Sequence, residues 1–111
     1  MDMQTGWNEN RALLRGTATA DPVWTHGVVY ELFPLEVLRL SGWADKINVI
    51  APRTLLEACP VRAGTSLEVE GEVRSFNNKS GRGSRLVITL HARTLRPGNG
   101  PDETRLTLAG V

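Results

Sequence analysis

The side chains best suited to chemistry lie between Arg74 and Pro101, where the chain carries several cations and no carboxylate. All twelve Asp and Glu residues lie outside this window. Its basic residues are Arg74, Lys79, Arg82, Arg85, Arg93 and Arg96. Such segregation creates a local positive potential even though the net charge is only +1, and phosphate is the ligand that it favours. A solvated hairpin that happens to be basic fits the charge pattern equally well.

The centre of this window, residues 77–84, is a polar stretch between two alternating segments. A tight hairpin needs only two turn residues, so this longer stretch predicts a projecting loop. Gly81 and Gly83 would allow positive φ angles and make the loop flexible. A flexible basic loop suits a single polynucleotide strand, whose backbone wanders more than that of a duplex. Within it, Asn77 and Asn78 are predicted to hydrogen-bond sugar or base edges.

Proteins that bind single strands combine a basic groove with aromatic side chains on which bases stack. The predicted phosphate contacts are Arg74, Lys79, Arg82, Arg85 and Arg93. The predicted stacking residues are Phe76, Trp43 and Tyr30. Phe76 shares its strand parity with Arg74, away from the apolar side that Val69 marks, so it should be exposed. The same alternation assigns Phe33 to the core.

Catalytic and metal chemistry find little support in the sequence. It lacks a Ser-His-Asp arrangement and a phosphate-cradling GxxxxGK[ST] loop, so we expect no enzyme. Cys59 is the only cysteine, and His26 and His91 are the only histidines, so we expect no disulfide, metal site or cofactor. His91 is interpreted as a structural surface histidine. A polar N-terminus, and no apolar run of about 20 residues, predict a soluble cytoplasmic protein without a membrane partner.

Residue periodicity predicts an all-β chain with one short helix. The expected strands cover residues 11–18, 28–40, 46–51, 67–74 and 86–93. Between the third and fourth strands, residues 52–59 begin with Pro52 and end before Pro60, as a two-turn helix does. A five-stranded barrel with one short helix between strands 3 and 4 is the pattern of the oligonucleotide/oligosaccharide-binding (OB) fold. Small SH3-like barrels remain an alternative.

The predicted OB-fold domain covers residues 8–96. Residues 97–103 have the Gly, Pro and Asn content of a linker. In residues 104–111, the segment RLTLAG echoes the RALLRG segment near the N-terminus. These last residues are therefore either the start of a second, truncated OB repeat or an extra strand that pairs with an exposed edge.

At several of these residues the chain resembles the bacterial single-stranded DNA-binding protein family. The matching segments are Asn10–Gly16, Asp21-Pro22 and the block VEGEVRSFNNKSGRGSRL, and the resemblance covers about residues 8–95. The segment from Phe33 to Asp45 is similar to a branch close to primosomal replication protein N and to tandem-OB members. This resemblance implies single-stranded DNA binding, assembly of a homodimer or higher homo-oligomer through the first strand, and no cofactor. Replisome or primosome proteins would be further partners.

The leading hypothesis is a non-catalytic single-stranded DNA-binding module of DNA replication, replication restart or repair. The chain departs from the family because Asn78 and Ile47 stand near where stacking aromatics are expected, which predicts weaker binding. Glu68, Glu70 and Glu72 would repel DNA, so we expect the outward face of the fourth strand to lie off the DNA path. The alternative is an OB-fold protein-interaction module of the primosome with little DNA affinity. Binding of structured RNA is a third interpretation.

Overall fold

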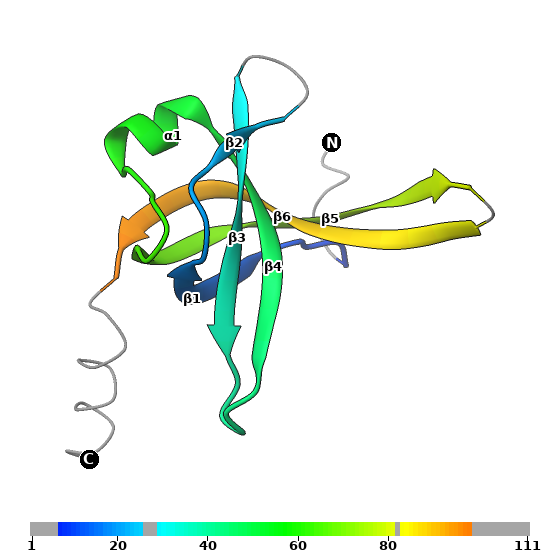
Figure 1. Ribbon diagram of the computed structural model, residues 1–111, viewed down its shortest axis with the longest axis horizontal. Helices are drawn as coiled ribbons and strands as arrows, with labels where there is room; N and C mark the ends of the chain where they lie inside the picture. Colours follow the sequence, from blue (N-terminus) through cyan, green and yellow to red (C-terminus); the bar gives the residue numbers. More distant parts are fainter. Residues whose placement is uncertain (1–6, 26–28, 82, 99–111) are drawn as a thin grey trace.

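The structure, a computed structural model, describes residues 7–25, 29–81 and 83–98 (Figure 1). The predicted phosphate contact Arg82 and the predicted repeat or extra strand at 104–111 lie outside these residues, as does most of the predicted linker. Within the described residues the elements are β1 (Ala12–Ala18), β2 (Val23–Trp24), β3 (Tyr30–Leu38), β4 (Ala44–Pro52), α1 (Arg53–Ala58), β5 (Ser66–Ser80) and β6 (Gly83–Pro97).

The strands form one sheet in the order β1-β5-β6-β4-β3-β2. Thr17 and Ala18 of β1 also pair with β3, which closes β1, β5, β6, β4 and β3 into a ring. All neighbours are antiparallel except β4 and β6, which run parallel with Asn48 beside Thr89. The predicted five-stranded barrel, with its helix before the fourth barrel strand, is confirmed. The two-residue strand β2 was not predicted.

The alternating pattern buries one side of each barrel strand. Phe33 is fully buried, as its phase predicts. Leu55 and Leu56 of α1 pack against the core, and this contact supports a helix that is too short to be stable alone. The core consists of Ala18, Phe33, Leu35, Val49, Ala51, Val61, Leu67, Val69, Leu90 and Ala92.

Gly71 lets β5 approach β6 closely at a break in their register. Glu70 lies opposite Thr94, whereas Gly71 lies opposite Ala92, so Arg93 is the extra residue of a β-bulge in β6. A Cβ atom at position 71 would lie 1.9 Å from the carbonyl oxygen of His91. Because that neighbour is backbone, this approach requires glycine.

The prediction that residues 77–84 form a long loop is wrong. β5 and β6 remain paired to Lys79↔Ser84 and beyond, which leaves only positions 81 and 82 between the strands. Gly81 has φ 65°, as a tight turn requires. Alternation of apolar residues indicates which side of a strand is buried, not whether the strand is paired. This hairpin extends away from the barrel with exposed side chains on both sides, so its strands can form from polar residues (Figure 1). We call residues 73–80 and 83–90 the ribbon.

Candidate nucleic-acid interface

A groove crosses the barrel from the β3–β4 pair to the base of the ribbon. Its lining mixes apolar side chains such as Ile50 and Val87 with polar side chains such as Asn48 and Thr89. Such a surface suits a nucleobase, which has an apolar face and a polar edge. The lining residues are Thr25, Tyr30, Leu32, Asn48, Ile50, Pro52, Glu72, Arg74, Phe76, Val87, Thr89, His91, Ala92 and Arg93.

The ribbon has two faces, because residues directly opposite each other in an antiparallel pair point to the same side. Phe76 lies opposite Val87, and both side chains line the groove. Side chains two residues further along each strand share this side. The groove face of the ribbon therefore carries four of the predicted site residues: Arg74, Phe76, Asn78 and Arg85.

The remaining two predicted residues of the ribbon belong to its back face. Asn77 lies opposite Leu86, and Lys79 lies opposite Ser84, one residue out of phase with Phe76. Ile88 is also exposed on this side. Asn77 and Asn78, which the loop prediction assigns to one binding surface, therefore point to opposite faces of the ribbon.

Glu72 lines the groove and is hydrogen-bonded to two of the predicted cations. Arg74 Nε donates to Glu72 Oε1 at 2.7 Å, and Arg93 Nη2 donates to Oε2 at 3.0 Å. The hydrogen bond from Arg74, reinforced by the charges of both arginines, lowers the pKa of the Glu72 carboxyl. Glu72 lines the same groove as Arg74 and Phe76, with which it shares strand parity, and the expectation that this position lies off the DNA path stays a prediction.

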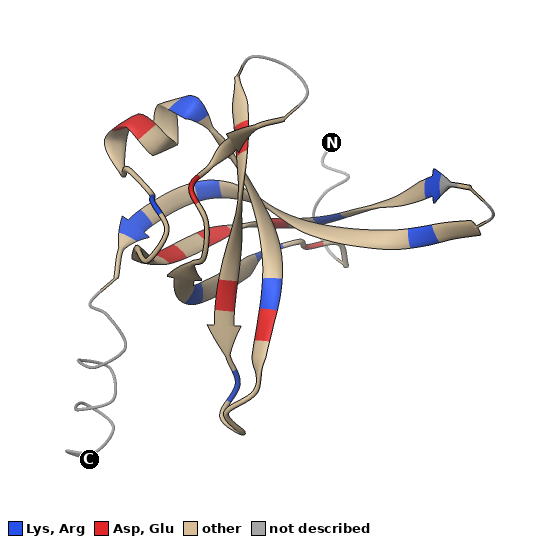
Figure 2. Cartoon of the chain, in the orientation of Figure 1, with Lys and Arg blue, Asp and Glu red and all other residues tan. Residues whose placement is uncertain are grey.

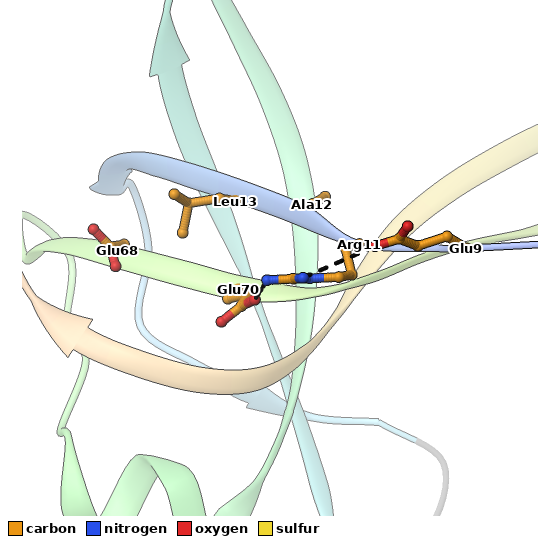
Figure 3. Close-up of a pocket in the computed structure, with 6 residues that line it drawn as sticks. All are labelled: Glu9, Arg11, Ala12, Leu13, Glu68 and Glu70. Atoms are coloured by element: carbon orange, nitrogen blue, oxygen red, sulfur yellow. Dashed lines mark hydrogen bonds and ion pairs between the residues drawn. The ribbon is translucent and has the colours of Figure 1, made fainter. Parts of the chain in front are cut away.

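The other two glutamates of β5 occupy a different hollow, beside β1 (Figure 3). Arg11 Nη2 donates to Glu70 Oε2 at 2.9 Å, and Figure 3 shows this guanidinium between Glu70 and Glu9. Glu68 pairs with Arg15. Carboxylates therefore dominate this end of β5, whereas Lys and Arg, drawn in blue in Figure 2, lie near the free end of the ribbon.

Several groove residues escaped the sequence analysis. Asn48 and Ile50 sit on β4, and Thr89 and His91 sit on β6, and the parallel β4–β6 pairing brings them together. The sequence indicates a structural surface role for His91, whereas the structure places it in the groove lining. Burial, reinforced by the charge of Arg74, lowers the pKa of its imidazole, although Glu72 opposes this shift. No local signal predicts this cluster, because it depends on two strands that are distant in the sequence.

The structure brings two of the three predicted aromatic residues to one surface. Tyr30 and Phe76 both line the groove. Trp43 instead lies at the β3–β4 turn with 73% of its surface exposed, and its carbonyl accepts a hydrogen bond from the Arg39 amide. The nearest groove residue along the chain is Asn48, five positions further on. In an extended strand, five residues span about 16 Å. Trp43 is thus not part of the groove.

No protein-family model matches the sequence, and no curated protein matches it. Solved structures do resemble its fold, and two of them illustrate the match. The dimeric N-terminal domain of PriB protein from Thermoanaerobacter tencongensis has a TM-score of 0.70 and 28% identity, over 82% of this chain and 98% of that one. The small single-stranded DNA-binding protein from Streptomyces coelicolor has a TM-score of 0.66 and 18% identity, over 84% of this chain and 97% of that one. The domain is an OB fold.

The predicted resemblance to single-stranded DNA-binding proteins and to the primosomal replication protein N branch is confirmed at the level of the fold, because both structures share it. In this fold the second and third barrel strands are β3 and β4, and the hairpin between the fourth and fifth is the ribbon. Within the described ranges, His, Cys, Asp and Glu form no group of three that could hold a metal ion. No helix in that part of the chain is long and apolar enough to cross a membrane.

Proposed function

We propose that this protein binds single-stranded DNA in the cytoplasm, without catalysing a reaction, during DNA replication, replication restart or repair. The observation that carries the proposal is the continuity between the groove and the groove face of the ribbon. In OB folds, the face of the second and third barrel strands and the hairpin between the fourth and fifth bind oligonucleotides. One of the similar structures is a single-stranded DNA-binding protein, and the other is from PriB protein.

Phe76 would be the main stacking platform. Its side chain projects into the groove from the base of the ribbon and is 53% exposed, so a base can cover it without displacing a protein contact. Arg74 and Asn78 lie two residues away on either side, about 6–7 Å along the strand. Arg85, opposite Asn78, adds a cation beyond the platform. A base stacked on Phe76 would therefore have its flanking phosphates near positive charge.

Arg85 is the groove-face cation best placed to bind phosphate. Within the part of the chain that the structure describes, it forms no ion pair, and the same is true of Lys79 near the ribbon tip. Both side chains are exposed. Free guanidinium and ammonium groups can release counterions when they bind a polynucleotide.

A homodimer through β1 is the proposed assembly. From Ala12 to Gly16, β1 has β5 on one side and no described strand on the other. An open strand edge is a template for pairing with a second chain. The PriB domain that this chain resembles is dimeric.

The protein-interaction module of the primosome remains a second candidate. Its support is Glu72, which offsets the charge of the groove arginines Arg74 and Arg93. Pull-downs that capture replisome proteins without DNA, and that survive neutralisation of Lys79 and Arg85, would favour it.

Titration of a fluorescent oligo-dT at several salt concentrations tests the leading proposal. The logarithm of the affinity should fall with the logarithm of salt, with a slope of about −0.7 per phosphate contacted. Arg85→Ala should reduce the steepness by about 0.7, because one phosphate contact is lost. Arg62→Ala, which removes an exposed arginine from the segment before β5, should leave it unchanged. No binding at low salt, or a slope near zero, would refute the proposal, and tighter binding to oligo-U would redirect it to RNA.

A further inference from the structure

The groove holds a carboxylate at the place where an incoming phosphate would meet two guanidinium groups. Each oxygen of Glu72 accepts from a different arginine: Oε1 from Arg74 and Oε2 from Arg93. The Glu72 side chain is only 22% exposed, whereas the two arginine side chains are more than half exposed. The arginines therefore fold their charged ends back onto the carboxylate rather than presenting them fully to solvent.

A carboxylate and a phosphate compete for the same donors, because both present paired anionic oxygens to the planar fork of a guanidinium. A phosphate can bind Arg74 or Arg93 at full strength only if the hydrogen bond to Glu72 is given up. The depressed pKa of the carboxyl keeps it ionised at neutral pH. Burial lowers the pKa of His91, which lies opposite Glu72, so this imidazole is less readily protonated than an ordinary histidine.

We propose that Glu72 is an internal competitor for the DNA backbone, which holds Arg74 and Arg93 in an intramolecular network and weakens phosphate binding in the groove. This inference rests on the proposed DNA-binding function and concerns its regulation. It divides the cations into two classes. Arg85, on the groove face of the ribbon, would bind phosphate without losing a partner, whereas the two groove arginines must exchange one anion for another.

The substitution Glu72→Gln tests this competition with little change in side-chain size. It should free two cations, tighten binding to oligo-dT at low salt and make the salt dependence steeper by up to about 1.4. The affinity gain over the wild-type protein should consequently be up to about sevenfold larger at about 50 mM salt than at about 200 mM. Adding Arg74→Gln and Arg93→Gln to this variant should return the slope to the wild-type value.

Asp45→Asn is the matched control. Asp45 is likewise paired with an arginine, through two bonds of 2.8 and 2.7 Å to Arg39, and it lies outside the groove lining. The substitution Asp45→Asn removes one negative charge, as Glu72→Gln does. Any gain in DNA affinity that comes from net charge alone therefore appears in both variants. Competition predicts that the slope changes only for Glu72→Gln.

The outcomes separate the competitor from the proposed function itself. If the wild-type protein binds and Glu72→Gln binds equally or more weakly, Glu72 is not a competitor, and the inference is overturned. If the wild-type protein fails to bind but Glu72→Gln binds, competition is supported while the wild-type function fails. If neither binds, both fail. Circular dichroism checks that each variant is folded, and Glu72→Ala carries the same test should the Gln variant not fold.

Discussion

The two faces of the ribbon offer a matched pair of apolar residues that should differ only in DNA contact. Phe76 is 53% exposed and points toward the groove, whereas Leu86 is 61% exposed and points to the back face. The two side chains belong to neighbouring cross-strand pairs, Phe76↔Val87 and Asn77↔Leu86. Replacing each with alanine removes a similar exposed apolar group from opposite sides of the same hairpin.

The expected loss follows from the stacking interaction. A base stacked on an aromatic ring contributes about 1–3 kcal/mol. Since about 1.4 kcal/mol corresponds to a tenfold change in affinity, Phe76→Ala should raise the Kd for oligo-dT about 5- to 140-fold. Leu86→Ala should change the Kd less than about twofold. Both positions are more than half exposed, so each variant should keep its stability within about 0.5 kcal/mol of the wild-type value.

Fluorescence anisotropy with a labelled oligo-dT measures both constants, and thermal unfolding checks stability. The salt dependence provides a second readout: Phe76→Ala removes no charge, so its affinity should fall by the same factor at every salt concentration. Equal losses in the two variants, or a larger loss for Leu86→Ala, would refute the assignment of the groove face as the DNA-binding side.

Two further predictions concern the barrel that positions this face. Gly71→Ala should destabilise the protein by about 3 kcal/mol or more, because the new Cβ would meet the His91 carbonyl, whereas Gly83→Ala, which has open space around it, should cost less than about 0.5 kcal/mol in chemical denaturation. Burial holds the pKa of His91 below its ordinary 6.5, so the unfolded chain binds a proton more readily than the folded one. Stability should therefore fall as pH drops below about 6.5, and His91→Gln should reduce this fall; unchanged pH dependence in that variant would contradict the prediction.

Much of the barrel could be predicted because its signals are local. Alternation identified the barrel strands and placed Phe33 in the core, and Pro52 marked the start of the helix. The length of the hairpin could not be predicted in the same way. Its side chains are solvated on both sides, so pairing from Asn77 to Lys79 leaves no apolar pattern.

The sequence by itself determined the order of the barrel strands and helix, the separation of acidic from basic segments, and the exposure of Phe76, since each depends on residue type and strand parity. Only the tertiary structure decided which of these residues share a surface. The parallel pairing of β4 with β6 brings Asn48 beside Thr89, and the bulge at Arg93 brings that guanidinium to Glu72. Register and pairing between distant strands depend on how the whole barrel closes, and no short stretch of sequence records that.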